Sequence, residues 1–504
     1  MDKNNDPLSE YRLVYRAKDF FESFMKQEKL RQKKPVSFNF ILNKFRFTLL
    51  EFIEDIIGTK FYISDDQLLP NISLKVKRLA ANLIKKKIIT KLEKISHTRP
   101  DEPKIIEYQS RIPSVLPDIS LYSDGSGSFS DMGGGSDLEE EKALLKAIGE
   151  AVERLSLCIY REENLVLSSY RKVSGKAVDP LSFVGISEAQ RKLDRILRID
   201  NESIFRWVEC FSLLNKKKVL IPAQLIYIGY KYHFREPIIR EQISTGAAAA
   251  DSFEEAAYKG ACEMVERDAF MVSYFNKLSL PIIDLEAIDD KMFQELLAKF
   301  KRYNLELYVV DITTDISIPS MSAVIIDRSG VGPVVHIGNK TSLNIKNAVI
   351  GAVYEALHGR LGYRRILPLS DPFKKRMKVL KSDPSQIKTF DDRFLYWASL
   401  DMINKLEFFF NGPKKRLSKK KLNKYENVSA KEKLKIVVNL FKDKNIDVYG
   451  IDITSPLVRE EGIYVAKVVS PQLQPLYLNE GVKHLSGRRL FSEDKLNPLP
   501  HPFL

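Results

Sequence analysis

Two stretches of the sequence carry paired glutamates at helical spacing. Residues 142–156 read KALLKAIGEAVERLS, and residues 253–270 read FEEAAYKGACEMVERDAF. Both contain the pattern E-x-x-E-R, which falls on Glu150, Glu153 and Arg154, and again on Glu263, Glu266 and Arg267. Residues three positions apart lie on one side of a helix, so these carboxylates repel one another and favour a cation nearby.

One acidic helix face is usually solvated, and Lys259 with Arg267 could brace the second one. A second copy of the pattern favours a site between two helices. Paired carboxylates suit Mg²⁺, which typically takes one or two carboxylates together with substrate phosphates. The small residues at 133–136 and 246–250 precede the two helices. We expect them to form loops whose free N–H groups bind phosphate oxygens.

The ordered pair of motifs resembles the YcaO family over roughly residues 133–504. The resemblance implies an α/β, YcaO-type ATP-binding fold of mixed sheets with flanking helices, which binds ATP and Mg²⁺ without a P-loop. It implies metal ligands at Glu150, Glu153, Glu263, Glu266 and Glu355, the last on an expected helix at 344–360. It implies nucleotide contacts at Lys146, Glu150, Glu153, Arg154, Glu255 and Arg267.

Two positions depart from the family pattern. Lys146 stands where the first family helix often has serine, so it either contacts phosphate or weakens nucleotide binding. His358 stands where relatives commonly carry glutamine, and a lone helical histidine is usually structural.

The chain ends in NPLPHPFL, with proline at every second position. Alternating prolines favour an extended segment, which by itself could be a solvated tail or a ligand for an SH3-type domain. In azoline-forming YcaO proteins such a terminus lies close to the active site. The resemblance therefore places Pro498, Pro500, Pro502 and Leu504 at the catalytic site. The Leu504 carboxylate and the His501 ring are the groups there that could move protons.

The resemblance implies an ATP-dependent cyclodehydratase. It would convert Cys, Ser or Thr of a ribosomally made precursor peptide to thiazoline or oxazoline by phosphorylating the backbone amide oxygen. It also implies an E1-like, leader-binding partner protein and is compatible with a flavin-dependent dehydrogenase and a homodimer. Two alternatives stay open: a YcaO enzyme that installs a backbone thioamide, which the proline tail argues against, and a non-enzymatic basic binding protein.

The composition is that of a globular protein with room for two or three domains, at 504 residues and 44% hydrophobic. The net charge is +14, and basic residues cluster at 72–99 and 414–424. Nucleic acid is the alternative partner for such clusters. Neither is interleaved with aromatic residues, so solvated faces or a docking surface for an acidic peptide are favoured.

The cysteines are too few for a disulfide scaffold and too far apart for a zinc motif, so we expect buried thiols at Cys158, Cys210 and Cys262. No signal peptide is recognisable, and no apolar run approaches the length of a membrane span. The sequence therefore predicts a cytoplasmic protein.

Hydrophobic periodicity divides the chain into two parts. Residues 1–110 are expected to be a helical accessory or docking domain, with helices at 10–29, 38–57 and 74–95. Residues 111–504 are expected to be the catalytic domain, with a charged helical insertion on the surface at about 368–434. Strands are predicted at 165–170, 205–211, 218–230, 305–312, 321–327, 448–454 and 464–470.

Overall fold

The computed structural model describes residues 72–95, 103–113, 132–193, 197–329, 333–364, 371–422 and 424–503. The helices expected at 10–29 and 38–57 lie outside these residues, as does Leu504.

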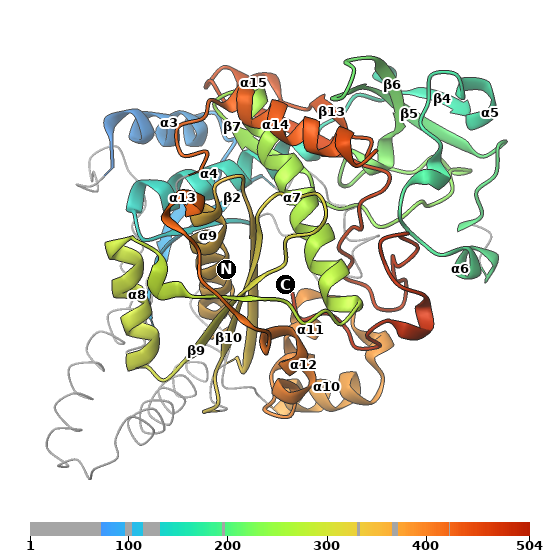
Figure 1. The fold of residues 1–504 in the computed structure, drawn as a ribbon. Coiled ribbons are helices and arrows are strands. Elements are labelled where there is room, and N and C mark those ends of the chain that lie inside the picture. Colours follow the sequence, from blue (N-terminus) through green and yellow to red (C-terminus); the bar gives the residue numbers. More distant parts are fainter. Residues whose placement is uncertain are drawn as a thin grey trace, which may run out of the picture.

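Three sheets form the framework (Figure 1). The first has the order β1–β2–β3 and is antiparallel, with β1 at Lys91–Ile95, β2 at Ile106–Arg111 and β3 at Met132–Asp137. The second has the order β11–β10–β9–β8–β12, and the third has the order β4–β5–β13–β14–β7 with β6 paired to β5. Only β8 and β12 pair in parallel among the described strands.

The strands of the two larger sheets confirm most of the predicted ones. The second sheet consists of β8 (Ile282–Ile283), β9 (Glu306–Asp311), β10 (Ser320–Ile326), β11 (Val335–Thr341) and β12 (Lys414–Lys415). The third consists of β4 (Val166–Ser169), β5 (Ile204–Ser212), β6 (Lys218–Pro222), β7 (Ala247–Ala250), β13 (Tyr449–Asp452) and β14 (Tyr464–Val469). The strand expected at 218–230 ends early, at Pro222, where a short 3₁₀ turn begins. Mixed sheets with flanking helices confirm the predicted α/β class.

Three long helices carry the glutamate motifs: α4 (Glu140–Leu157), α7 (Phe253–Phe275) and α9 (Ile345–Arg364). Ser252 caps α7, because its hydroxyl accepts a hydrogen bond from the Glu255 N–H at 3.4 Å. Helix α4 packs on β3, α9 packs on β11, and α7 packs on β7 and β14. The three sheets therefore hold one motif helix each.

The two segments expected to be phosphate-binding loops are largely strands, so that expectation was wrong. Residues 133–136 belong to β3, and residues 247–250 form β7. A Cβ added to Gly135 would come within 3.0 Å of the Ala143 carbonyl oxygen and the Ala147 nitrogen of α4. Small residues here allow a helix to approach a strand closely, a role that composition does not distinguish from a turn.

The helix expected at 74–95 was predicted too long. Helix α3 spans Leu74–Lys85, and Lys87 adopts a positive φ of 57° before β1 begins. The chain turns at Lys87 toward the sheet, and the side chains of Ile88 and Ile89 that follow are buried. Strand β2 thus pairs with β1 on one side and with β3 on the other, while the domain boundary at residue 110 stays a prediction.

The insertion at about 368–434 is helical, as predicted, but only part of it lies on the surface. It contains α10 (Asp371–Ser382), α11 (Phe390–Trp397), α12 (Met402–Phe410) and α13 (Lys419–Leu422), and α14 (Ala430–Asp443) follows. Phe409 of α12 packs against Phe270 and Tyr274 of α7, with ring centroids 5.9 and 6.3 Å apart, and Trp397 of α11 belongs to the same buried cluster. The segment was predicted to lie on the surface because charged residues are interspersed with these apolar ones in the sequence.

Helix α8 spans Lys291–Arg302 and packs on β9. All three cysteines are buried and free, as predicted, and burial raises the pKa of each thiol. None of the described helices is long and apolar enough to cross a membrane.

The close contact of α4 with β3 predicts a specific sensitivity. Gly135→Ala should lower the free energy of unfolding by about 1–3 kcal/mol or more, because backbone atoms cannot move aside as a flexible side chain can. Gly362→Ala in α9 is the control, since a Cβ there meets nothing within 4 Å, and it should stabilise by up to ~1 kcal/mol. Urea unfolding measures both. Equal stability of the two variants would contradict this account.

Candidate active site

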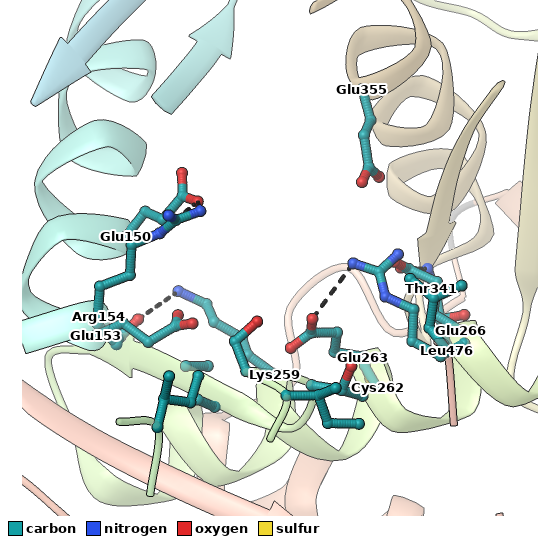
Figure 2. A pocket seen from close by; sticks show the side chains of 18 of the residues that line it. Glu150, Glu153, Arg154, Lys259, Cys262, Glu263, Glu266, Thr341, Glu355 and Leu476 are labelled. Carbon is teal, nitrogen blue, oxygen red and sulfur yellow. Dashed lines mark hydrogen bonds and ion pairs between the residues drawn. The ribbon is translucent and has the colours of Figure 1, made fainter. Parts of the chain in front are cut away.

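The motif helices enclose one large cavity of about 1280 Å³. It is bounded by α4, α7 and α9, by residues 228–232, 240–245, 247–249, 340–344 and 476–479, and by Phe503. All five glutamates predicted as metal ligands line it, as Figure 2 shows: Glu150, Glu153, Glu263, Glu266 and Glu355. The tertiary structure therefore brings together side chains that lie up to about two hundred positions apart in sequence.

The α4 wall presents Glu150 and Glu153. Glu150 accepts a hydrogen bond from the Gly134 N–H at 2.6 Å and one from Arg154 Nε at 3.1 Å. Burial raises the pKa of Glu153 well above its ordinary value, and the charges of Glu263 and Glu150 raise it further. Strand β3 thus contributes an N–H donor to the site even though it is not a loop.

The α7 wall presents Glu263 and Glu266, with Arg267 between them. Glu263 accepts from the Gly246 N–H at 3.1 Å and from Arg267 Nη2 at 3.3 Å. Glu266 accepts from the Thr341 N–H at 2.7 Å and from Arg267 Nη1 at 3.0 Å. Burial raises the pKa of Glu266 to about 8, although nearby cationic side chains oppose this shift.

The α9 wall presents Glu355 and His358. Burial raises the pKa of Glu355, and the charges of Arg267 and Lys340 act in the opposite direction. His358 Nδ1 lies 3.6 Å from Glu107 Oε1, too far for a hydrogen bond. His358 lines the cavity, and the structural role favoured for it stays a prediction.

Basic side chains surround the glutamates. Lys146 lines the cavity, as the phosphate-contact prediction requires, and its Nζ donates to Asp137 Oδ2 and to the Ser136 carbonyl oxygen, each at 2.8 Å. Lys259 Nζ lies 3.5 Å from the Ala249 carbonyl oxygen. Glu255, a predicted nucleotide contact, lies 3.5 Å from Lys433 of α14.

Sequence reasoning missed Lys467. It lies in β14 and is buried, and its Nζ donates to the carbonyl oxygens of Ile243, Ser244 and Thr245 at 2.8, 3.1 and 2.7 Å. Burial lowers its pKa to about 7. These bonds fix the turn before Gly246, whose N–H holds Glu263. A lone lysine within the apolar strand YVAKVV is the sequence signal that could have found it.

The donor set fits Mg²⁺ and nucleotide phosphates. Among the described residues, no three His, Cys, Asp or Glu side chains gather closely enough to hold a metal ion by themselves. Mg²⁺ usually takes only one or two carboxylates together with phosphate oxygens, so glutamates on separate walls suit a site that the ligand completes. Lys146, Lys259, Lys340 and Arg267 supply positive charge for the phosphates.

The proline tail reaches this cavity through one side chain. The Phe503 ring lies over the Arg267 guanidinium, with 4.5 Å between the guanidinium carbon and the ring centroid. Pro500 and Pro502 are buried and Pro498 is exposed, and none of the three lines the cavity. The position predicted for Leu504 lies outside the described residues.

Hydrogen bonds fix the tail in place. The Pro500 carbonyl oxygen accepts from Tyr274 Oη at 3.0 Å and from Trp397 Nε1 at 3.1 Å, and the His501 carbonyl oxygen accepts from Arg393 at 2.9 Å. His501 Nε2 lies 2.8 Å from the Tyr477 carbonyl oxygen, and burial lowers the pKa of this ring well below its usual value. His501 is thus a neutral, packed group that does not line the cavity.

The raised pKa of Glu266 predicts how stability depends on pH. The ligand-free protein holds this proton more tightly than the unfolded chain, so stability falls as pH rises from about 4.5 to about 8. Glu266→Gln should make the fall in melting temperature across this range smaller. Glu254→Gln, at an exposed position of the same helix, is the control. Identical pH profiles for Glu266→Gln and the parent would contradict the assignment.

Two uncharacterized proteins are relatives in sequence. One, from Methanothermobacter thermautotrophicus, is 22% identical over 278 residues, which are 55% of this chain and 67% of that protein. The other lies in the tfuA 3′ region of Rhizobium leguminosarum bv. trifolii and is 30% identical over 140 residues, 26% of this chain and 33% of that protein.

Solved structures share the fold. A heterocyclase in complex with substrate and cofactor matches with a TM-score of 0.63 and 20% identity over 84% of this chain. The match covers only 57% of that heterocyclase. YcaO from Methanopyrus kandleri bound with AMPPCP and Mg²⁺ matches with a TM-score of 0.56 and 16% identity, over 83% of this chain and 95% of the other. The E. coli microcin synthetase McbBCD complex matches with a TM-score of 0.52 and 14% identity, over 88% and 100%.

A family model described as YcaO cyclodehydratase, ATP- and Mg²⁺-binding, matches residues 134–474. This range contains the three motif helices and all five cavity glutamates, and it covers more than half of the chain. The chain therefore belongs to the YcaO family of ATP- and Mg²⁺-binding cyclodehydratases.

Proposed function

We propose that this protein is a peptide cyclodehydratase that uses ATP and Mg²⁺ to form thiazoline or oxazoline rings in a ribosomally made precursor peptide. The observation that supports this most strongly is one cavity lined by glutamates of three helices together with Phe503 of the proline-rich tail. The glutamates suit Mg²⁺ and phosphates, and the tail is the feature that distinguishes ring formation from thioamide formation in the family resemblance.

The proposed reaction has two stages. The side-chain thiol or hydroxyl of the substrate residue bonds to the preceding carbonyl carbon and gives up its proton, and the former carbonyl oxygen accepts the terminal phosphoryl group of ATP as ADP leaves. The C–O bond then breaks, phosphate departs, and the former amide nitrogen loses its proton to form C=N. Overall, ATP hydrolysis accompanies the loss of the amide oxygen.

The chain's own residues position and stabilise the reacting groups. Glu263, Glu266 and Glu355 would hold Mg²⁺, which when bound would neutralise charge that develops on the phosphates. Lys146 and Arg267 face the same space and attract phosphate oxygens. Catalysis by positioning and electrostatics needs no side-chain nucleophile.

Partners follow from the same proposal. A leader-binding, E1-like protein would deliver the precursor peptide, and a flavin-dependent dehydrogenase could oxidise the rings afterwards. The N-terminal residues up to about 110 are proposed as the docking part, with a cytoplasmic site of action. The fold match to a multi-protein synthetase complex is compatible with such partners, although it demonstrates only the fold.

Mass spectrometry of the peptide product tests the function. The full chain is incubated with Mg²⁺, ATP, sodium sulfide and a Cys-containing peptide, with and without a leader-binding, E1-like protein. Loss of one water per ring, dependent on ATP, is expected. Exchange of one oxygen for sulfur would establish the thioamide alternative. Unchanged peptide with no ATP consumption would favour a binding protein.

Lys146 should contribute binding that the ground state and transition state share. Lys146→Ala is expected to raise the KM for ATP about tenfold while changing kcat much less, because loss of shared binding acts on KM. Steady-state ATP hydrolysis measures both constants. Lys142→Ala is the matched control, since Lys142 lies one turn earlier on α4, is exposed and pairs with Glu139. An unchanged KM would contradict a phosphate contact and show that Lys146 serves only in its ion pair with Asp137.

Phe503 should matter for ring formation more than for nucleotide binding. Phe503→Ala removes the ring over Arg267 and is expected to slow cyclisation about tenfold or more, because small misplacements of a site cost that much. The affinity for Mg²⁺·AMPPCP should change little. Phe491→Ala, at an exposed position outside the cavity, is the control. Normal cyclisation by Phe503→Ala would remove the tail from the proposal.

A further inference from the structure

The cavity has a second cationic element that the reaction described above does not use. Arg240 lines the cavity, yet its side chain is only 6% exposed. Within the part of the chain that the structure describes, its one hydrogen bond runs from Nη1 to the Val184 carbonyl oxygen, at 3.2 Å. Its Nε is buried without a partner. Burial lowers the pKa of Arg240 to about 10, and no neighbouring carboxylate offsets the shift.

Other buried arginines that the structure describes have a carboxylate partner or several hydrogen bonds, although Arg360 and Arg393 also leave the Nε atom without a partner. Arg360 pairs with Asp327 at 2.9 Å, and Arg393 pairs with Glu480 at 2.8 Å. Arg191 donates to four backbone carbonyl groups. A guanidinium that leaves water costs several kcal/mol unless charge and hydrogen bonds compensate. Arg240 is therefore an exception that needs an explanation.

The groups around Arg240 do not supply that compensation. The charge of Arg240 lowers the pKa values of His484 and Lys467, so both lie close to it. His484 accepts a hydrogen bond at Nε2 from the Glu241 N–H, at 3.3 Å. The Glu241 carboxylate accepts from the Leu478 N–H at 3.2 Å. His484 and Lys467 therefore supply no negative charge that would compensate Arg240.

We propose that Arg240 binds an anionic oxygen group of the ligand that fills this corner of the cavity. The planar guanidinium fork matches both carboxylates and phosphates, and the apolar residues Ile186, Ile238 and Val482 line the same cavity. The anion is either a carboxylate of the peptide or a phosphate of the nucleotide or product. The choice of these two ligand classes rests on the proposed function, whereas the anion site itself rests on the surroundings of Arg240.

Stability of the ligand-free protein separates a binding arginine from a structural one. Arg240→Met removes an uncompensated buried charge, so its melting temperature should equal or exceed that of the parent. Arg235→Met is the matched control, because Arg235 belongs to the same segment, is exposed and does not line the cavity. A fall of several degrees for Arg240→Met alone would overturn the proposal and make Arg240 structural.

Binding measurements identify the anion. Isothermal titration with Mg²⁺·AMPPCP and inorganic phosphate tests phosphate, and the peptides acetyl-Asp-Cys-Asp-amide and acetyl-Asn-Cys-Asn-amide test carboxylate. We expect Arg240→Met to lose about tenfold or more in affinity for one class, and Arg240→Lys to lose less. A loss of affinity for the phosphate probes alone supports a phosphate site. A loss of affinity for the aspartate peptide alone supports a carboxylate site.

Equal affinities of Arg240→Met and the parent for every probe would overturn the proposal, as would failure of the parent to bind any of them. None of these measurements requires ring formation. If the parent binds in an Arg240-dependent way but modifies no peptide, the proposed function fails and the anion site stands.

Discussion

Repulsion between buried carboxylates is the constraint on which the rest of this structure depends. Glutamates from α4, α7 and α9 meet at one cavity, and burial together with their mutual charge raises their affinity for protons. Arg154 and Arg267 offset part of this cost through direct contacts. A divalent cation with phosphate oxygens would offset more of it, which is why such a cluster is suited to binding rather than to stability.

The scaffold holds these like charges together by close backbone packing. Gly135 lets α4 lie directly on β3, and Gly338 does the same for α9 on β11, since a Cβ at either position would overlap the helix backbone. Backbone N–H groups of Gly134, Gly246 and Thr341 then reach three different glutamates. The same contacts therefore set both the spacing of the helices and the orientation of the acids.

The tail and the helical insertion form the second part of the arrangement. Helices α11 and α12 bury aromatic side chains against α7, and Arg393 ties the His501 backbone to Glu480. Phe503 is thereby held over Arg267, the residue that contacts both α7 glutamates. A change in the insertion would reach the proposed phosphate site through this chain of contacts, although the insertion itself lies outside the glutamate cluster.

Local pattern determined a great deal about this protein. Helical periodicity is a property of neighbouring residues, so the three motif helices, most strands and four glutamates of the site could be predicted from the sequence. The family resemblance added the fifth glutamate, Glu355. Features that depend on long-range packing could not be predicted. Residues 133–136 form a strand because they pair with β2, and α11 is buried because α7 and the tail pack in the same cluster. Tertiary contacts alone bring Arg240 to the cavity and Lys467 to the turn before Gly246, since a single lysine or arginine carries no periodic signal. Only the folded structure decides whether such a charged side chain faces water, a carbonyl group or a cavity.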